Sequence, residues 1–164
     1  MTQKEPKLAL GSKARDLASG LEGVLYAWVR TWDGMIQYDL LLPSSDGKTL
    51  GDHQQIDEAL LEVVDEYIAG KATAPPPTTL RNGMKVRDVV TGWKGTITEE
   101  CVFVNGCRFF TVTPAQEKGE KWKAGILFPA TRLEQVPSGA VVEPPSNARE
   151  TGGPIGRDVK RKFA

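Results

Sequence analysis

The chain repeats itself at a fixed spacing, and this repeat constrains its fold more than any other feature. Residues 11–23 and 83–95 both read G-x-K-x-R-D-x-x-[ST]-G-x-x-G. With no gap, the same shift places Asp33-Gly34 over Asn105-Gly106. We call this shift, which separates Gly11 from Gly83, the repeat spacing. Self-similarity at a fixed period indicates a repeated structural unit, so we expect two homologous units in tandem.

Each copy of the motif predicts a strand followed by a turn. Lys13 and Arg15 alternate with small or apolar residues, which is typical of a strand with one solvated face. Ser19-Gly20 and Thr91-Gly92 predict the turn, because Gly adopts positive φ easily and a preceding Asp can bond the turn amides. These turn residues have a structural role in this interpretation, and they are Asp16, Gly20, Gly23, Asp88, Gly92 and Gly95.

A β-hairpin is predicted next in each unit. Residues 23–32 and 95–104 are rich in β-branched and aromatic side chains. They end in Asp-Gly and Asn-Gly, the strongest short-range signal for a two-residue type I′ turn. We therefore expect the return strands over residues 35–42 and 107–113.

A two-residue turn at Asn105-Gly106 would also set the register of the second hairpin. Val104 would pair with Cys107, so that Cys101 would lie on the opposite face from Cys107. A disulfide between the two cysteines is not expected in that geometry. Because this hairpin is apolar on both faces, one face should pack on the first unit or on a partner.

The segment 56–68 carries apolar residues at helical spacing, but its repeat partner contains a proline, so we expect a turn and a strand in both copies. Five short strands with tight turns predict an all-β fold of two small SH3-like barrels with extended arms. The expected divisions are an N-terminal arm (1–9), repeat 1 (10–66), a Pro-rich linker (67–80), repeat 2 (81–137) and a Pro/Gly-rich basic tail (138–164).

The motif, the Asn-Gly-Cys-Arg of residues 105–108 and the Leu-Glu-x-Val of residues 133–136 resemble small uncharacterised proteins of tailed bacteriophages and prophages. The repeat is also similar to the KOW/SH3-like barrels of transcription and translation factors. This resemblance implies a fold and a phage origin and carries no activity. The first repeat has Met35-Ile36 in place of Cys107-Arg108, so a role tied to that pair would not extend to it.

The residue inventory disfavours catalysis, metal binding and cofactors. His53 is the only imidazole, and Cys101 and Cys107 are the only other soft ligands, which is too few for a structural zinc site. A nucleophilic triad needs a base held by a third group, and His53 lies in a polar segment. No phosphate-binding glycine motif occurs. We expect a protein that is not an enzyme.

Residues 52–66 contain six carboxylates and no Lys or Arg, which indicates a solvated acidic face. Such a face could meet a basic partner, including the tail of this chain. Tryptophan suggests a second surface, because exposed Trp beside Arg can anchor a peptide or stack on bases. The alternative is that the Trp side chains pack in the core. The candidate residues for this interaction surface are Trp32, Trp93, Trp122 and Arg108.

The tail ends in a cationic cluster of Arg157, Lys160, Arg161 and Lys162, followed by Phe163. A disordered solubilising tail is one interpretation, and contact with an acidic groove or with phosphates is the other.

The overall charge disfavours a dedicated nucleic-acid coat, because 21 Lys and Arg balance 21 Asp and Glu. No apolar stretch is long enough for a bilayer or a signal peptide, so we expect the protein in a virion or the host cytoplasm. The predicted function is a non-enzymatic phage interaction or structural module, either a capsid or head–tail component or an adaptor for a host factor. Its partners would be phage or host proteins, in a homo-oligomer or larger assembly, and no membrane.

The alternative is a nucleic-acid or nucleotide-binding module that uses Trp stacking, the basic tail and four cations of the repeated motif. Those cations are Lys13, Arg15, Lys85 and Arg87.

Overall fold

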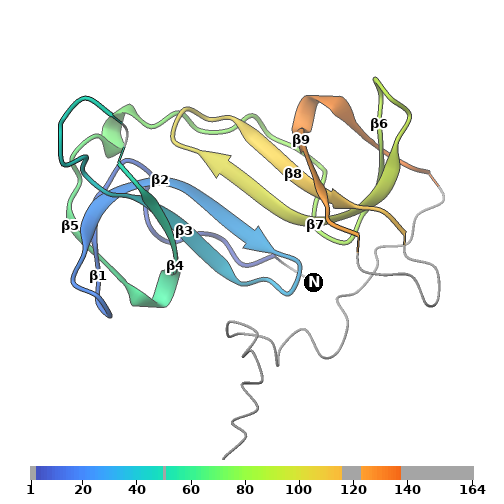
Figure 1. The fold of residues 1–164 in the computed structure, drawn as a ribbon. Helices are drawn as coiled ribbons and strands as arrows, with labels where there is room; N and C mark the ends of the chain where they lie inside the picture. The colour runs from blue at the N-terminus through green and yellow to red at the C-terminus, as the bar shows by residue number, and fades with distance from the viewer. Residues whose placement is uncertain (1–2, 50, 116–122, 138–164) are drawn as a thin grey trace, which may run out of the picture.

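A computed structural model describes residues 3–49, 51–115 and 123–137, and it shows an all-β protein, as the sequence predicts. The first half contains β1 (Lys13–Asp16), β2 (Glu22–Thr31), β3 (Ile36–Leu41), β4 (His53–Asp57), the 3₁₀ helix η1 (Glu58–Leu60) and β5 (Leu61–Asp65). The second half contains η2 (Ala69–Lys71), β6 (Lys85–Asp88), β7 (Lys94–Phe103), β8 (Arg108–Thr113), β9 (Ile126–Pro129), η3 (Ala130–Arg132) and β10 (Leu133–Gln135). Figure 1 shows the two groups of strands side by side.

Strand pairing follows the same order in the two halves, and every pair is antiparallel. In the first half β1 pairs with β2, β2 with β3 and β3 with β4, and β5 returns to pair with β1. In the second half β6, β7, β8 and β9 pair in sequence, and β10 returns to β6. The segment 56–68 forms a 3₁₀ turn and a strand, which confirms that prediction.

Each half has a hydrophobic core of its own. Tyr38 is fully buried in the first core and Phe110 in the second, and these two positions are separated by the repeat spacing. Five further pairs of core positions share that spacing: Ala14 and Val86, Leu25 and Ile97, Leu40 and Val112, Ile56 and Phe128, and Leu61 and Leu133. Burial of each large apolar side chain contributes about 1.5–3 kcal/mol, so each half can stabilise its own strands.

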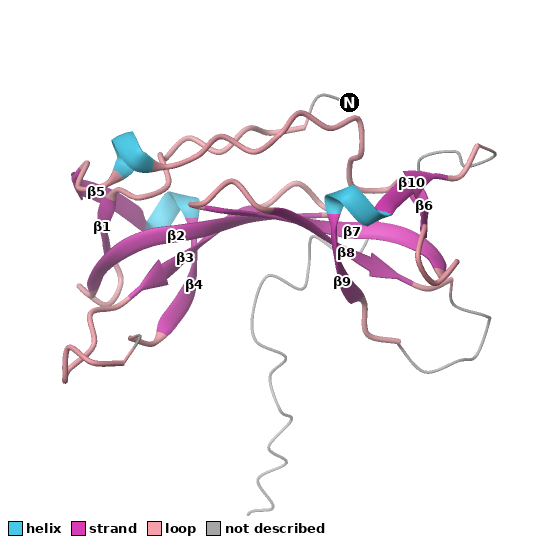
Figure 2. Cartoon of the chain, turned by 90° about the horizontal axis from the view of Figure 1, so that it is seen from above, coloured by secondary structure: helices cyan, strands magenta, loops and turns pink. Residues whose placement is uncertain are grey.

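The two halves join through a pairing that the sequence does not predict. β2 and β7 lie antiparallel, with register pairs that run from Ala27–Phe103 to Thr31–Glu99. The ten strands therefore belong to one open antiparallel sheet. Figure 2 shows this sheet as a continuous arch.

The predicted type I′ turns are wrong. The Gly34 amide donates to the Thr31 carbonyl (2.9 Å) and the Thr31 amide donates to the Met35 carbonyl (2.9 Å), which closes a three-residue loop. Gly34 has φ 85°, whereas Asp33 is not among the described residues with positive φ, so the loop is a type I turn with a glycine bulge. The second hairpin has the same loop, in which Gly106 donates to Phe103 (2.9 Å).

The extra loop residue shifts the predicted register by one position. Val102 lies opposite Arg108, and Cys101 lies opposite Phe109. Because side chains alternate along a strand, Cys101 and Cys107 occupy the same face, contrary to the prediction. Both are free thiols.

The last glycine of the repeated motif lies inside a strand, which corrects its interpretation as a turn residue. Gly23 lies in β2 and Gly95 lies in β7. A Cβ atom at Gly23 would overlap the carbonyl oxygen of Leu41, and one at Gly95 would overlap that of Thr113. Glycine is required at both positions because the neighbouring backbone passes too closely for a side chain.

Two extended segments cover one side of the central sheet. The Leu8 amide donates to the Tyr38 hydroxyl (2.9 Å), and this hydroxyl donates to the Leu8 carbonyl (3.0 Å). The end of the linker is fixed by Asn82, which follows it and whose Nδ2 donates to the carbonyls of Arg30 and Thr31 (2.9 Å each). Figure 2 shows both segments on the same side of the arch. No described segment crosses the middle of the opposite side.

Candidate interaction surface

Three aromatic side chains meet on the uncovered side of the sheet, at the junction of the two halves. The Tyr26 and Phe103 rings lie 5.4 Å apart at 69°, and the Phe103 and Phe109 rings lie 5.8 Å apart at 86°. Tyr26 comes from β2 at a register shift between Leu25 and Ala27, so its ring projects beside β7. The Tyr26 side chain is 41% exposed. We call the surface around Tyr26, Phe103 and Phe109 the aromatic face.

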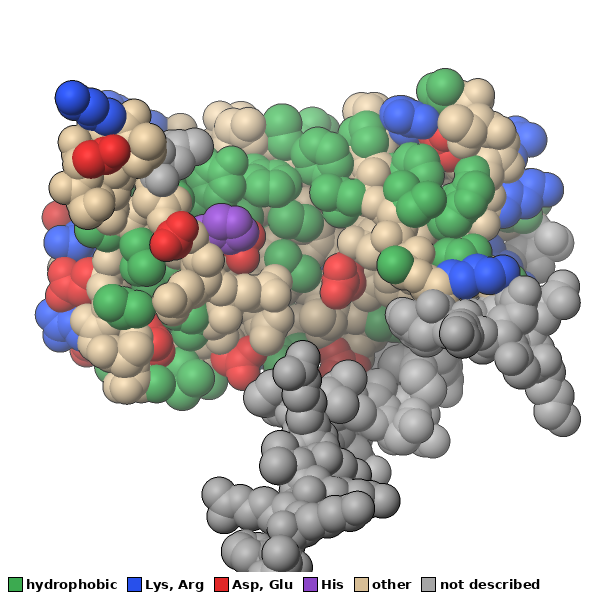
Figure 3. All heavy atoms as spheres, in the orientation of Figure 1, with side chains coloured by type: hydrophobic (Ala, Val, Ile, Leu, Met, Phe, Trp, Pro, Cys, Tyr) green, Lys and Arg blue, Asp and Glu red, His purple; other side chains and the backbone are tan. Residues whose placement is uncertain are grey.

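Apolar side chains extend the aromatic face on both sides of the junction. Val29 pairs with Cys101 at the centre of the β2–β7 ladder and is buried beneath the surface. Leu127 pairs with Thr111 at the outer strand β9 and is 52% exposed. Figure 3 shows hydrophobic side chains gathered over the middle of the molecule in this view. Contiguous exposed apolar groups of this kind mark surfaces that contact other molecules.

Carboxylates surround the aromatic cluster. Glu99 accepts a hydrogen bond from the Thr111 hydroxyl (3.0 Å), and Asp57 accepts one from Gln37 Nε2 (2.7 Å). Asp39 is half-buried, and burial raises the pKa of its carboxyl group against a smaller opposing effect of His53. None of the described residues donates a hydrogen bond to the Asp39 carboxylate.

The Cys101 thiol lies close enough to several carboxylates for their charges to raise its pKa. Its pKa is raised to about 12, first by burial and then by the negative charges of Asp39, Glu99 and Glu100. Burial and these charges disfavour the thiolate form of Cys101, which packs under the face. The described strand positions of the face around the β2–β7 junction, which are 27–31 on β2, 99–103 on β7 and the positions opposite them on β3, β4, β8 and β9, include no Lys or Arg on this side. In Figure 3 the Lys and Arg side chains lie toward the two ends of the molecule.

The covered side of the same strands holds a buried ionic cluster. Arg30 and Glu100 are each only 5% exposed, and Arg30 Nη1 lies 2.8 Å from Glu100 Oε2. Arg108 Nε lies 3.0 Å from the other oxygen of Glu100. The N-terminal arm completes the cluster, because Arg30 Nη1 also donates to Gln3 Oε1 (2.8 Å). Arg30 further stacks over Trp28, with 5.2 Å between the guanidinium carbon and the ring centroid.

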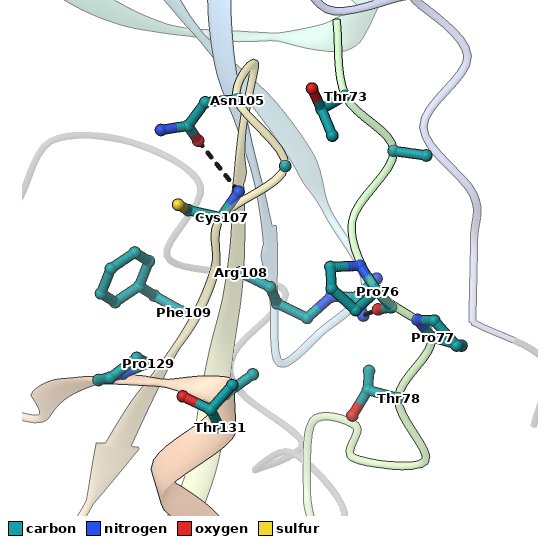
Figure 4. A pocket seen from close by; sticks show the side chains of 13 residues that line it. Thr73, Pro76, Pro77, Thr78, Asn105, Cys107, Arg108, Phe109, Pro129 and Thr131 are labelled. Atoms are coloured by element: carbon teal, nitrogen blue, oxygen red, sulfur yellow. Dashed lines mark hydrogen bonds between the residues drawn. The ribbon is translucent and has the colours of Figure 1, made fainter.

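A groove of about 500 Å³ lies between the linker and the tip of the second hairpin (Figure 4). Pro76 and Pro77 form one wall, and residues 129–131 form another. Arg108 points into the groove and donates to the Pro76 carbonyl. Because Glu100 already pairs with Arg108, this groove presents a compensated cation and is poorly suited to a phosphate.

The structure separates the residues that the sequence assigns to an interaction surface. Trp32 is half-buried in the loop between β2 and β3. Trp93 is half-buried and packs on Phe128 of the second core, with ring centroids 5.5 Å apart. Arg108 belongs to the covered ionic cluster. The remaining candidates, Trp122, Arg157, Lys160, Arg161 and Lys162, lie outside the described residues.

Sequence reasoning missed the aromatic face itself. The sequence did contain one signal for it: the second hairpin is apolar on both faces, and each apolar face needs something to pack against. The structure places Phe103 and Phe109 of that hairpin beside Tyr26 of the first half. Because Tyr26 comes from the other half of the chain, no local pattern could indicate this neighbour.

The aspartates of the repeated motif organise the turns that follow β1 and β6. Asp16 accepts hydrogen bonds from the amides of Ala18 and Ser19 (3.1 Å each). Asp88 accepts from the Thr91 amide (3.0 Å) and also binds Arg132 through two contacts of 2.9 and 2.6 Å. The Ser19 hydroxyl, which also donates to Asp16, and the two amides lower the pKa of Asp16, and Arg132 followed by Thr91 lowers the pKa of Asp88.

The acidic segment 52–66 is only partly a solvated face. Glu58 is buried, accepts a hydrogen bond from the Lys7 amide (2.8 Å) and pairs with Lys4 (3.1 Å), so it anchors the N-terminal arm. Across the part of the chain that the structure describes, no group of three or more His, Cys, Asp and Glu could hold a metal ion. Within the same residues, no helix has the length and apolar character needed to cross a membrane.

Comparison with known proteins gives no match to a protein-family model, a curated protein or a solved structure. Function is therefore inferred from the chemistry of the surface.

Proposed function

We propose that this chain is a non-enzymatic interaction module of a phage, built from two tandem copies of an SH3-like barrel, whose aromatic face docks on another protein. Support for the duplicated barrel comes from the shared strand order. In each half a 3₁₀ helix precedes the last strand, which returns to pair with the first. The pairs of core positions that share the repeat spacing add to this support.

The observation that carries the docking role is the aromatic cluster itself. Tyr26, Phe103 and Phe109 lie at the centre of the sheet, on the side that neither the arm nor the linker covers. Tyr and Phe are enriched at the centres of protein interfaces, because they bury a large area at a small entropic cost. A surface with this composition supports a protein partner, either in a phage particle or in the infected cell.

Nucleic-acid binding is the alternative that the sequence leaves open. The aromatic face does not favour it, because Asp39, Asp57 and Glu99 would repel phosphates. The groove beside Arg108 does not favour it either, since Glu100 compensates that cation.

Quantitative mass spectrometry of purified phage particles tests the proposal. We expect the wild-type chain at a fixed ratio to the major capsid protein, and loss of the folded Y26S/F103S double variant from the particles. V89S/V90S is the matched control, since Val89 and Val90 are exposed apolar residues far from the face in sequence and are not part of it. Equal incorporation of Y26S/F103S and wild type would contradict docking through this face. Absence of the wild-type chain from clean particles would contradict the virion form and leave the host adaptor, tested by the same variants in infected cells.

A further inference from the structure

We propose that the aromatic face binds a cationic segment of its protein partner, in which Lys or Arg residues flank an aromatic or aliphatic side chain. This inference rests on the proposed docking function and adds the chemistry of the partner. The charges, the rings and the apolar border of the face each support it.

The first observation is an incompletely paired carboxylate. Asp39 lies on β3 opposite Ala27, next to the β2–β7 junction, and no described residue donates a hydrogen bond to it. Glu99 flanks the same junction from β7, opposite Thr31. Half-buried carboxylates are stabilised by a cation that approaches within hydrogen-bonding distance. Two such groups beside one aromatic cluster favour a ligand with more than one positive charge.

The second observation is the arrangement of the rings. Phe103 lies nearly perpendicular to both Tyr26 and Phe109, at 69° and 86°. Tyr26 is 41% exposed, and Phe103 and Phe109 are partly exposed, so the cluster is open to a ligand. A Lys or Arg over a ring face gains about 0.5–1 kcal/mol at an exposed site, and more where water is excluded. The rings and the carboxylates therefore favour the same ligand charge.

The third observation is that the described strand positions around the β2–β7 junction have no Lys or Arg on this side that could compete. Lys and Arg side chains lie toward the ends of the molecule, and His53 on β4 is the one imidazole of the chain. A patch of a single sign steers an oppositely charged partner and disfavours a like-charged one. An acidic peptide or a nucleic acid would therefore be repelled by the carboxylates here.

The apolar border determines the rest of the ligand. Leu127 is exposed beside the cluster, and Val29 and Cys101 form its floor. A purely polar cationic peptide would leave this border in water. An aromatic or aliphatic side chain between the charges would cover it, at about 25 cal/mol for each Å² of apolar surface removed from water.

Fluorescence anisotropy with the full-length chain tests this inference. The probe is a short labelled peptide with Lys and Arg on both sides of a Phe. One control peptide replaces Lys and Arg with Glu, another replaces Phe with Gly, and a labelled single-stranded oligonucleotide is the third ligand. We expect saturable binding of the first peptide, weakened by added salt, and no saturable binding of the Glu peptide or the oligonucleotide.

The double variant D39N/E99Q should weaken binding of the cationic peptide about five- to tenfold, as expected for two partly exposed charge pairs. E62Q/E134Q is the matched control, because Glu62 and Glu134 are exposed carboxylates on the edge strands β5 and β10. This control should bind like wild type. Equal weakening by both double variants, or no effect of D39N/E99Q, would overturn the inference.

Other occupants give different results, and each would overturn the proposal. Tighter peptide binding by the full-length variant R157Q/K160Q/R161Q/K162Q than by wild type would show that the tail of the chain occupies the face. A dimer that the peptide dissociates would show that a second copy occupies it. Tighter binding of the oligonucleotide than of the peptide would show a nucleic-acid site.

The inference and the docking function can fail separately. If Y26S/F103S abolishes particle incorporation while the cationic peptide fails to bind wild type, the face docks a partner of different chemistry. If the peptide binds and depends on Asp39 and Glu99 while incorporation is unaffected by Y26S/F103S, the face binds cations and the proposed role in the particle is wrong.

Discussion

The two halves of the molecule share their core positions and differ where they meet. Trp28 and Glu100 are separated by the repeat spacing, as are Arg30 and Val102. In the β2–β7 ladder Trp28 lies opposite Val102 and Arg30 lies opposite Glu100. The ladder is therefore centred on Val29–Cys101, a pair of positions with the same spacing. The two halves are therefore related by an approximate twofold rotation about this pair. The residues that this rotation would exchange are different in the two halves.

This difference explains why the halves pair with each other. Two copies of the first half in the same register would place Arg30 opposite Trp28, where the exposed Glu5 (3.4 Å) would be its remaining carboxylate partner. Two copies of the second would place Glu100 opposite Val102, where Arg108 would be its remaining cation. Loss of a buried charge partner is destabilising, so the mixed pairing, in which the buried Arg30 and Glu100 lie opposite each other, satisfies these charges best. The difference between the halves at this junction favours the sheet in which β2 pairs with β7, and this sheet creates the aromatic face.

The substitution E100Q should have the largest effect on the junction between the halves. It removes the buried carboxylate that pairs with both Arg30 and Arg108 and leaves Arg30 with only the exposed Glu5, which predicts a loss of about 3–5 kcal/mol in the free energy of unfolding. Denaturant unfolding measures it. Adding R30M should recover part of the loss, because it removes one of the charges that have lost this partner. A loss below about 1 kcal/mol for E100Q would show that the junction does not depend on the charge pair.

The substitutions G23A and G95A test the close approach of neighbouring strands that both halves show. Each adds a Cβ that overlaps a carbonyl oxygen of the neighbouring strand, so each should lower the free energy of unfolding by about 1–3 kcal/mol. The control is G70A, since a Cβ at Gly70 meets no atom within 4 Å. Thermal unfolding of the three variants checks the expectation. A large loss in only one half would mean that the close strand approach is not common to both.

Tyr38 and Phe110 occupy equivalent core positions, and only the first has a hydroxyl. Y38F removes the hydrogen bonds that hold Leu8 and should cost about 1 kcal/mol while increasing hydrogen exchange at the Leu8 amide. Retained protection at Leu8 would contradict the anchoring role. F110Y is the reciprocal variant, and it should also destabilise, because a hydroxyl on this fully buried ring would need a hydrogen-bond partner.

Arg132 distinguishes the two motif turns, because the corresponding residue of the first half is Leu60. Its guanidinium is the main reason that the pKa of Asp88 lies well below its ordinary value. A lowered pKa adds stability that is present above the unfolded value of 3.8 and is lost as the pH falls below it. R132L should raise the Asp88 pKa, and its stability deficit relative to wild type should shrink as the pH falls below about 4. NMR titration of the Asp88 and Asp16 carboxyl groups measures the change, and an unshifted Asp88 would contradict this role for Arg132.

Sequence periodicity predicts the strands well and their pairing less well. Alternation at Lys13 and Arg15 and the Asp-Gly and Asn-Gly signals locate the hairpins, because these signals are local. The register is wrong by one residue because a two-residue and a three-residue loop share the same Gly signal, and the conformation of Asp33 or Asn105 decides between them. The β2–β7 pairing joins residues from different halves of the chain and has no local signature. The aromatic face depends on that pairing, so it could not be predicted.

Site-specific photo-crosslinking in the cells that produce the protein tests most directly whether the aromatic face at the junction docks a protein. A photoreactive phenylalanine analogue replaces Tyr26, Phe103 or, as the control, the exposed Val90. We predict the same crosslinked partner from positions 26 and 103, and no such product from position 90. Crosslinks that are equally frequent at all three positions, or that join positions 26 and 103 to unrelated proteins, would contradict docking through this face.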